Sequence, residues 1–451
     1  MKHAVIVGGG ISGLSAAYEL DKAGVPYTLI ERAPSLGGVI RTNRIGGSTI
    51  EAGPDSFISQ KPAALELIRE LGMADQVIGS NDHQRITFLQ RHGRLVPLPD
   101  GLMMMIPTKV WPMVKTPLFG WGTKIKMGLE YFRKPEAFPD RSVAEFVRDH
   151  FGQETVDYLA EPLLAGVYGG DPRELSVLST LPRFVEMERK QGSLTKAALL
   201  SKPPKPQPGA PTLFRTLKSG LGSLVDALRP KQTVLHGASV DALERTAEGG
   251  FRVRRGGDCI EASHVVLAGP AYEAGRLLDG RLGELLSGVP YASSATVAMG
   301  YRKSEIGEMK GFGILVPGVE RKRMRACTFV SNKFSGRVED GYEVIRCFVG
   351  GIADEGVLDL SDDEIVATLR EELRELLGIT AAPEFAVVER WRRAMAQYTV
   401  GHNARWEEIQ GLAAKVPGLY LAGNGYRGIG IPDCIEMGRA AGRGIAAGIS
   451  D

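Results

Sequence analysis

The pattern of apolar and polar positions predicts a strand followed at once by a helix at the start of the chain. The apolar run 4–7 is short and β-branched, which is typical of a strand buried on both faces. Apolar residues from Ile11 to Leu20 then recur at helical spacing, and the helix is expected to end near Gly24. A second apolar run, 27–30, predicts the next strand. Strand, helix and strand in this order are typical of an α/β sheet.

The same periodicities predict further elements along the chain. In chain order we expect a strand over 48–56, a helix over 62–71, a hairpin over 85–99, a helical run over 142–168, strands over 234–236, 238–243, 251–254 and 261–271, mostly alternating strands over 290–350, a charged helix over 362–377, a buried strand over 418–424 and a helix over 435–449.

Three glycines directly after the first strand give the chain its first candidate chemistry. Gly8, Gly10 and Gly13 have the G-x-G-x-x-G spacing, in which the first glycine makes a tight turn, the second lets a pyrophosphate approach and the third lets helix and strand pack closely. Glu31 follows Gly13 by 18 positions, where a carboxylate can accept hydrogen bonds from a ribose diol. The preceding strand, the following helix and this acid favour a dinucleotide site over an ordinary glycine turn, and the carboxylate favours FAD or NAD over NADP.

Two later glycine stretches fit the same interpretation. The pair Gly37–Gly38 predicts a loop that passes against the dinucleotide, with Arg41 near its diphosphate; a plain turn with a solvated Arg is the alternative. Residues 423–428 repeat the G-x-G-x-x-G spacing, but no acid-tipped strand can follow so near the chain end. We therefore expect one nucleotide fold split into pieces, with the last strand and helix returning to the same cofactor.

The segment 102–129 is rich in Met and Trp and is interrupted by prolines and lysines. It predicts a helical core or a plastic pocket lining, or a surface that rests on a membrane through aromatics flanked by Lys. Because prolines break any long amphipathic face, we favour core or pocket lining. The proline-rich stretch 201–211 reads as an extended linker.

Length, charge and cysteine use narrow the class of protein. A chain of 451 residues is expected to form two or three domains. Its 55 basic and 53 acidic side chains give a net charge of +2, which predicts no nucleic-acid partner. The four cysteines form no C-x-x-C pair, which predicts neither a zinc site nor a disulfide framework and favours a reducing cytoplasm. We expect no leader peptide and no membrane span.

Seven stretches of the chain together resemble a known family. The stretches are GGGISGLSAAYEL, ERAPSLGGVIRT, EAGPDSF, MMMIPTK, EPLLAGVYGGDPRELS, MAQYTVGH and LYLAGNGYRGIGIPDCIEMG. They are similar to those of the FAD-dependent protoporphyrinogen and coproporphyrinogen oxidases of the flavin amine oxidase superfamily. The resemblance implies an α/β protein: a discontinuous Rossmann-like FAD-binding domain (1–55, 212–275 and 394–451), a mixed-sheet α+β substrate domain (56–99 and 276–393) and an inserted, mostly helical domain (100–211).

The resemblance also implies an activity and its partners. One FAD per chain, bound noncovalently, would oxidise protoporphyrinogen IX to protoporphyrin IX with dioxygen as acceptor, releasing hydrogen peroxide in three two-electron steps; coproporphyrinogen III is the alternative substrate. A flavin amine oxidase, a carotenoid-type desaturase and a flavoprotein without turnover are more distant alternatives. The expected location is the cytoplasm, either free or peripheral on the cytoplasmic membrane face, as a monomer or homodimer and in contact with a neighbouring haem-pathway enzyme.

The site residues follow from the motifs and the resemblance. For FAD they are Gly8, Gly10, Ile11, Ser12, Gly13, Glu31, Arg32, Gly37, Gly38, Arg41, Gly53, Pro54, Asp55, Val240, Ala268, Trp391, Gly423, Asn424, Gly430, Ile431 and Ile435. For the substrate they are Arg85 as a propionate anchor, Gly166 and Gly169 as a close approach to a flat ring, and Asn332. No metal ligand and no acid or base is nominated. Val39 stands where many superfamily members carry Arg, and Cys434 is expected to be a small packed residue.

Overall fold

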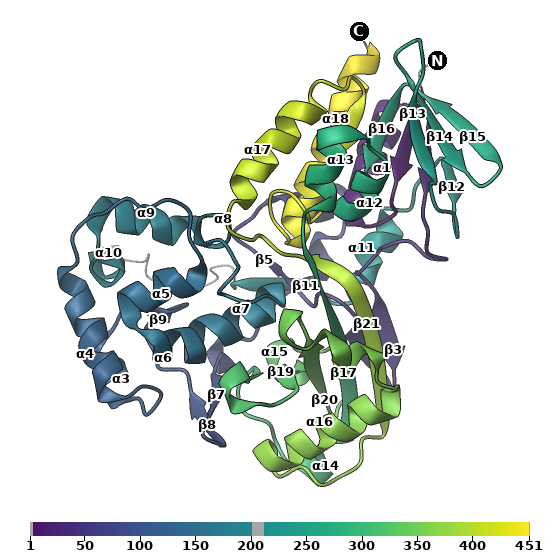
Figure 1. Cartoon of the computed structure of the whole chain (residues 1–451). Coiled ribbons are helices and arrows are strands. Elements are labelled where there is room, and N and C mark those ends of the chain that lie inside the picture. The colour runs from purple at the N-terminus through teal and green to yellow at the C-terminus, as the bar shows by residue number, and fades with distance from the viewer. Residues whose placement is uncertain (1–2, 201–211, 451) are drawn as a thin grey trace. The chain divides into compact units, whose positions relative to one another are not determined.

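A computed structural model describes residues 3–200 and 212–450, so the expected linker 201–211 lies outside the described residues (Figure 1). The chain divides into two compact units. Unit 1 comprises Met1–Ser80, Thr212–Pro290 and Ala404–Asp451, and unit 2 comprises Asn81–Pro211 and Tyr291–Asn403. The predicted α/β class is confirmed, whereas the division into three domains stays a prediction.

Unit 1 is built on a parallel sheet whose strands come from three separate parts of the chain. Its order is β12-β2-β1-β16-β22, and every neighbouring pair is parallel. The strands are β1 (Ala4–Val7), β2 (Tyr27–Ile30), β12 (Thr233–Leu235), β16 (His264–Leu267) and β22 (Leu419–Leu421). One nucleotide-type fold is therefore assembled from distant segments, as the glycine stretches predicted.

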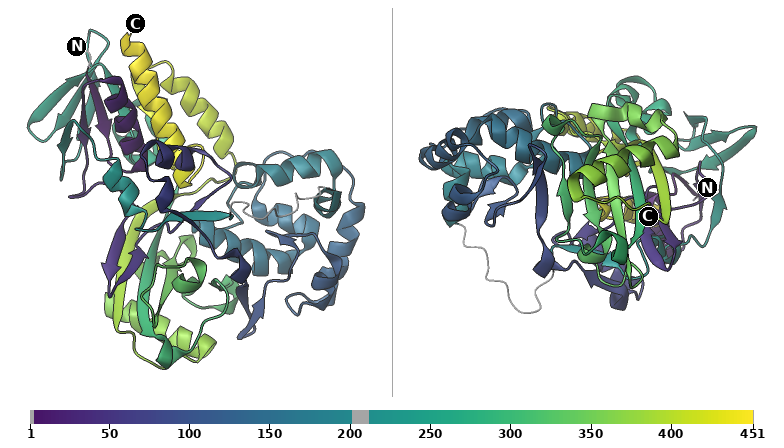
Figure 2. Two further views of the ribbon diagram at one scale, coloured as in Figure 1. Left: turned by 180° about the vertical axis from the view of Figure 1, so that it is seen from behind. Right: turned by 90° about the horizontal axis from the view of Figure 1, so that it is seen from below.

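Two helices cover this sheet side by side: α1 (Ile11–Ala23) and α18 (Ile431–Ser450) (Figure 2). They approach closely because glycines face the partner helix: a Cβ on Gly438 would lie 2.1 Å from the Ser12 carbonyl oxygen. The expected start of α18 at Ile435 was wrong by one turn. Pro432 lies in the first turn of the helix, where its missing N–H costs nothing, so it does not delay the start.

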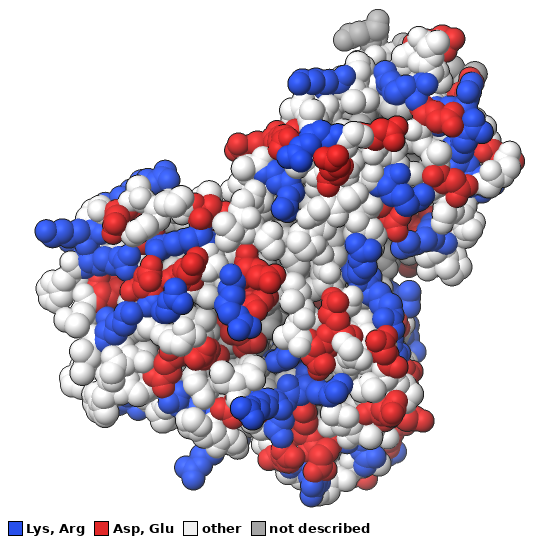
Figure 3. All heavy atoms as spheres, viewed as in Figure 1, with Lys and Arg blue, Asp and Glu red and all other residues white. Residues whose placement is uncertain are grey.

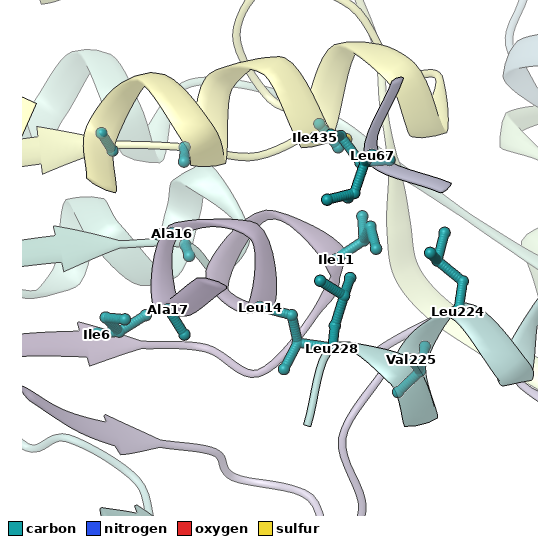
Figure 4. Packing of buried hydrophobic residues seen from close by; sticks show 14 of the residues in the cluster. Ile6, Ile11, Leu14, Ala16, Ala17, Leu67, Leu224, Val225, Leu228 and Ile435 are labelled. Atoms are coloured by element: carbon teal, nitrogen blue, oxygen red, sulfur yellow. The ribbon is translucent and has the colours of Figure 1, made fainter. Parts of the chain in front are cut away.

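The core of unit 1 explains why residues 56–80 belong to it rather than to the substrate region. Leu67 and Ile68 of α2 (Ala63–Glu70) are fully buried in the same cluster as Leu14 and Ile435 (Figure 4). Residues 57–58 and 77–79 also pair with β11 (Phe214–Leu217) in a small antiparallel sheet. This shared core moves the observed boundary to Ser80.

The remaining elements of unit 1 are short. They are β3 (Thr42–Ile45), β4 (Ser48–Glu51), β5 (Phe57–Ile58), β6 (Val77–Gly79), α11 (Gly222–Ala227), β13 (Ala242–Arg245), β14 (Phe251–Arg255), β15 (Asp258–Ala262), α12 (Ala271–Arg276), α13 (Gly280–Ser287) and most of α17 (His402–Ala413). The strand predicted over 238–243 begins only at residue 242, because the Ala238 N–H donates to the Glu31 carbonyl at the end of β2 instead of to a strand.

Unit 2 contains a seven-stranded mixed sheet of order β21-β17-β20-β19-β18-β7-β8. Its strands are β7 (Thr87–Arg91), β8 (Arg94–Pro97), β17 (Tyr291–Arg302), β18 (Gly313–Leu315), β19 (Met324–Phe329), β20 (Tyr342–Gly350) and β21 (Phe385–Ala396). Helix α16 (Asp362–Leu377) buries Ile365, Leu369 and Leu373 in the core on one face of this sheet. The predicted hairpin over 85–99 and the helix over 362–377 are both confirmed.

The helices of unit 2 between residues 110 and 200 form a second core around Phe146, Phe151 and Leu159, which are fully buried. They are α3 (Val110–Lys115), α4 (Trp121–Leu129), η3 (Glu130–Phe132), α5 (Val143–Phe151), α6 (Gln153–Thr155), η4 (Val156–Ala160), α7 (Glu161–Tyr168), α8 (Val177–Thr180), α9 (Pro182–Gln191) and α10 (Leu194–Leu200). Ser142 and Glu145 form a capping box at the start of α5. The predicted run 142–168 is interrupted at Gly152, whose φ is +94°.

Acidic and basic side chains are interspersed over the face shown in Figure 3, in agreement with the small net charge of +2. No helix within residues 3–200 and 212–450 is both long and apolar enough to cross a bilayer.

Candidate functional site

The glycine loop after β1 has the geometry that a diphosphate requires. A Cβ on Gly8 would lie 3.0 Å from the backbone of Ala268, and one on Gly13 would lie 1.9 Å from the Gly8 carbonyl oxygen. These two glycines therefore serve close packing of the protein itself. A Cβ on Gly10 meets nothing within 4 Å, so this glycine borders open space in front of the α1 N-terminus. Free amides at that end of the helix, at Ile11 and Ser12, favour an anion there.

A second loop closes over the glycine loop from the side. The Gly37 N–H donates to the Gly9 carbonyl at 2.8 Å, and a Cβ on Gly38 would lie 3.3 Å from the Gly10 Cα. The predicted proximity of this glycine pair to the first motif is thus observed. Arg41 at the end of the loop is exposed. Its role at the diphosphate stays a prediction.

Glu31 is oriented by the backbone at the end of β2. Its Oε2 accepts the Gly9 N–H at 2.6 Å, and its Oε1 accepts the Ala33 N–H at 2.7 Å. Each carboxylate oxygen can accept a second hydrogen bond, which leaves acceptor capacity for a ribose diol. The carboxylate therefore lies where the motif requires it, beside the glycine loop.

The carboxyl ends of the neighbouring strands complete this edge of the sheet. The Ala268 N–H donates to the Val7 carbonyl at 2.8 Å, and a Cβ on Gly423 would lie 3.3 Å from the Gly269 carbonyl oxygen. Val240 is buried, and its carbonyl accepts a hydrogen bond from Arg276 at 2.6 Å. A ligand of a parallel α/β sheet binds outside these strand ends.

A second helix N-terminus, that of α18, lies next to the first. Gly430 and Ile431 form it, and Ile435 behind them is fully buried. Asp433 in its first turn accepts the Gly430 N–H at 3.2 Å and pairs with Lys61 at 2.6 and 2.7 Å from the ammonium to its two oxygens. The ion pair between Lys61 and Asp433 was not predicted from the sequence. The local signal for it is that Asp433 is an acidic residue three positions after Gly430.

Burial raises the pKa of the Cys434 thiol to about 12, although a hydrogen bond with Ser12 opposes the shift. The thiol therefore stays protonated and is a poor nucleophile. This agrees with the expected role of Cys434 as a packed residue.

Several other predicted flavin residues lie in unit 1, and their role at the cofactor stays a prediction. Arg32 pairs with Glu273 of α12 at 3.2 Å, with two thirds of its side chain exposed. Gly53 packs on the Val39 carbonyl, where a Cβ would lie at 1.9 Å. Three more predicted residues, Pro54, Asp55 and Asn424, are half-buried.

The predicted substrate residues all belong to unit 2, as does Trp391 on β21. Arg85 precedes β7 and is exposed. Gly169 ends α7 with φ +58°, and a Cβ there would lie 3.4 Å from the Met395 sulfur. Both N–H groups of the Asn332 amide are engaged by carbonyls of the loop at Met309 and Gly311, which leaves this amide little capacity to donate to a substrate.

Sequence reasoning also missed Glu161, at the start of α7. Burial raises the pKa of this carboxyl, although the Gly318 N–H that it accepts at 2.9 Å and the nearby Arg325 oppose the shift. Among the described residues, no group of three or more His, Cys, Asp or Glu side chains is placed to hold a metal ion.

Comparison with known proteins decides the family. Residues 11–446 match the family described as flavin containing amine oxidoreductase. This chain belongs to that family. A coproporphyrinogen III oxidase of Bacillus subtilis (strain 168) is 34% identical to it over 98% of this chain and 97% of the relative. A protoporphyrinogen oxidase of Macaca fascicularis is 32% identical over 97% of each chain. The resemblance to porphyrinogen oxidases is thereby confirmed.

Solved structures agree with this placement. A protein of Exiguobacterium sp. 255-15, provisionally assigned as a protoporphyrinogen oxidase, superposes with a TM-score of 0.90 at 30% identity and covers 99% of each chain. Cyclohexylamine oxidase from Brevibacterium oxydans IH-35A superposes with a TM-score of 0.73 at 17% identity, covering 100% of this chain and 99% of the oxidase. The second likeness concerns the fold alone.

Proposed function

We propose that this chain binds one FAD noncovalently and oxidises a porphyrinogen to the porphyrin, with dioxygen as acceptor and hydrogen peroxide as the second product. The observation that carries the proposal is similarity over nearly the full length to relatives named porphyrinogen oxidases, at 32 to 34% identity. The open position at Gly10 in front of α1 supports it, because a bound diphosphate needs that space.

The residues of unit 1 have distinct roles in holding FAD. The α1 N-terminus and Gly10 face the diphosphate, and Glu31 accepts the ribose hydroxyls. The α18 N-terminus supplies a second positive helix end, which would favour negative charge on a bound cofactor. When bound, FAD supplies the two-electron chemistry of each oxidation step. The protonated, buried Cys434 supports binding without a covalent bond.

The substrate that we favour is coproporphyrinogen III. The family resemblance implied protoporphyrinogen IX as the first expectation and coproporphyrinogen III as its alternative. Bacterial relatives from Bacillus subtilis and Propionibacterium freudenreichii, each 34% identical, are named coproporphyrinogen III oxidases. Coproporphyrinogen III carries four propionates and protoporphyrinogen IX two, so the favoured substrate needs more cations. Arg85 is proposed as one of them, and Gly166 and Gly169 as the face that approaches the ring.

An amine oxidase is less well supported. Such an enzyme is expected to carry an aromatic cage beside the flavin, of which Tyr426 could supply at most one half. The Tyr426 ring is 1% exposed and packs on Trp406 at 5.1 Å between centroids, inside unit 1. A buried, packed ring does not form the wall of a substrate cage.

Turnover of the two porphyrinogens tests the proposal. The flavin-loaded protein is mixed with either substrate in air, and porphyrin fluorescence and hydrogen peroxide are followed. We expect both products, with a larger kcat/KM for coproporphyrinogen III. A larger value for protoporphyrinogen IX would reverse the substrate assignment, and absence of both porphyrins would overturn the activity.

A further inference from the structure

Helix α12 carries a glutamate that contacts the end of a different strand. The helix follows β16 at the carboxyl edge of the parallel sheet of unit 1. Its Glu273 pairs with Arg32, which comes two residues after β2, with 3.2 Å between Glu273 Oε1 and Arg32 Nη1. In the sheet, β1 lies between β2 and β16. This ion pair therefore bridges the segments that follow the two neighbours of β1.

Arg276, three residues later on α12, contacts a further segment. Its Nη2 donates to the Val240 carbonyl at 2.6 Å, and its Nη1 donates to the Asp241 carbonyl at 3.2 Å. Its Nε donates to the second oxygen of Glu273 at 3.3 Å. A planar guanidinium that donates from all three nitrogens is fixed in orientation. Arg32, Glu273 and Arg276 thus form one continuous set of contacts, which we call the α12 network.

The segment that Arg276 contacts is also joined to the end of β2. The Ala238 N–H donates to the Glu31 carbonyl at 3.0 Å. Residues 238–241 are therefore held at one end by β2 and at the other end by α12. Glu31 is the proposed acceptor for the ribose hydroxyls of FAD. Because the one ribose ring of FAD carries the adenine, the α12 network lies at the adenosine end of the proposed cofactor site.

Open space borders the same edge of the sheet. A Cβ on Gly10, or on Gly269 between β16 and α12, would meet no atom within 4 Å other than those of its chain neighbours. The side chains of Arg32, Glu273 and Arg276 are 66%, 32% and 51% exposed, so solvent and salt reach both ion pairs. Exposed ion pairs contribute little to the stability of a fold. A role at a ligand is therefore measurable in ligand binding with little change in stability.

We propose that the α12 network retains FAD by bridging the adenosine end of its site, and that salt therefore speeds cofactor release. The pair between Arg32 and Glu273 opens when the adenosine leaves, and dissolved salt weakens that pair. Arg276 positions the backbone of residues 240–241 beside it. All three are positioning residues, because none of them carries the chemistry. The inference rests on the proposed binding of FAD and adds to it a control of cofactor exchange.

Release of FAD from the loaded full-length protein tests the proposal. The protein is diluted into buffers of rising sodium chloride concentration, and the released FAD is separated by ultrafiltration and measured by absorbance over time. At low salt we expect Glu273→Gln to release FAD about three to ten times faster than the parent. The difference should shrink at high salt, because salt screens the ion pair of the parent and finds no pair in the variant.

Two further variants show whether the ion pair itself is responsible. Glu408→Gln is the matched control, because Glu408 forms an exposed ion pair with Arg281 at 2.8 Å, also within unit 1. This control should release FAD as the parent does. Arg32→Gln should behave as Glu273→Gln does, and the double variant should release FAD no faster than either, since both changes remove the same pair. The melting temperature verifies that each variant is folded.

Comparison of FAD with FMN separates the α12 network from a general weakening of the site. FMN carries the flavin and one phosphate but no adenosine. We expect Glu273→Gln to weaken the binding of FAD to the flavin-free full-length chain and to leave the binding of FMN unchanged.

Two results would overturn the role of the network and leave the proposed binding of FAD intact. The first is equal release of FAD by Glu273→Gln and the parent at every salt concentration. The second is an equal loss of affinity for FAD and for FMN. A parent protein that binds no FAD would instead overturn the proposed function itself.

Discussion

Helix α1 in unit 1 buries Leu14, Ala17 and Leu20, whereas helix α4 in unit 2 exposes Trp121, Ile125 and Leu129. A buried glutamate also stands in α1 and directly after α4. Glu19 of α1 is neutralised by Arg439 of α18 at 2.5 Å, while Glu130 after α4 is held by His150 and by backbone N–H groups. The comparison teaches that helical spacing of apolar residues defines a face, but a buried polar anchor can decide that this face points outward.

The largest expected effect comes from disrupting the packing of α1 on β1 in unit 1. Gly13→Val places a side chain against the Gly8 carbonyl, which a Cβ alone would approach to 1.9 Å, so β1 and α1 cannot pack. We expect a protein that retains no flavin and melts far below the parent, as measured by absorbance and calorimetry. Gly10→Ala is the matched control: its Cβ meets no protein atom within 4 Å, so it should fold but bind flavin more weakly. Normal flavin content in Gly13→Val would refute the assignment of this loop.

The next largest effect comes from removing the buried Glu130 carboxylate, which fixes the end of α4. Glu130→Ala leaves the N–H groups of Leu194 and Thr195 and the His150 ring without their buried acceptor. We expect the free energy of unfolding to fall by about 3 to 5 kcal/mol in urea denaturation. Glu136→Ala, at an exposed position six residues later in the same protein, should stay within about 0.5 kcal/mol of the parent. Equal stability of the two variants would mean that Glu130 does not hold the helix.

One chemical change on each helix sharpens the comparison. Leu14→Ala removes a fully buried side chain of α1 and should lower the free energy of unfolding by about 2 to 5 kcal/mol. Leu129→Ala removes a side chain of α4 that is 64% exposed and should change it by less than about 0.5 kcal/mol. Chemical denaturation of both variants gives the two values. A large loss in Leu129→Ala would show that this side chain is buried in solution.

The smallest expected effect is a change in the free energy of unfolding at low pH. Burial of Glu130 would raise its pKa, but hydrogen bonds from His150 and Thr195 outweigh burial and hold the pKa below the ordinary value of 4.5. The ionised group therefore contributes its full stability above pH 4.5, and this contribution is lost as the pH falls through the lowered pKa. The stability difference between the parent and Glu130→Gln should shrink as the pH falls below 4.5. A difference that grows in acid would contradict this sign.

Local sequence rules predicted the nucleotide half well. Gly8, Gly13 and Glu31 could be found from the sequence because they belong to one strand–helix–strand unit within the first 31 residues. The pair Lys61–Asp433 is separated by 372 positions, so only the assembled fold brings it together. The orientation of α4 was missed for a similar reason: it depends on Glu130 meeting His150 and the start of α10, which the spacing of Trp121, Ile125 and Leu129 does not encode.

The central claim is that unit 1 holds FAD and that the chain uses it to oxidise a porphyrinogen. The most direct test mixes the flavin-loaded protein with coproporphyrinogen III under nitrogen and follows flavin absorbance. The account predicts that the oxidised flavin band bleaches while porphyrin fluorescence appears, and that admitting air restores the band. A protein that binds no FAD, or a flavin band that stays unchanged with both porphyrinogens, would contradict it.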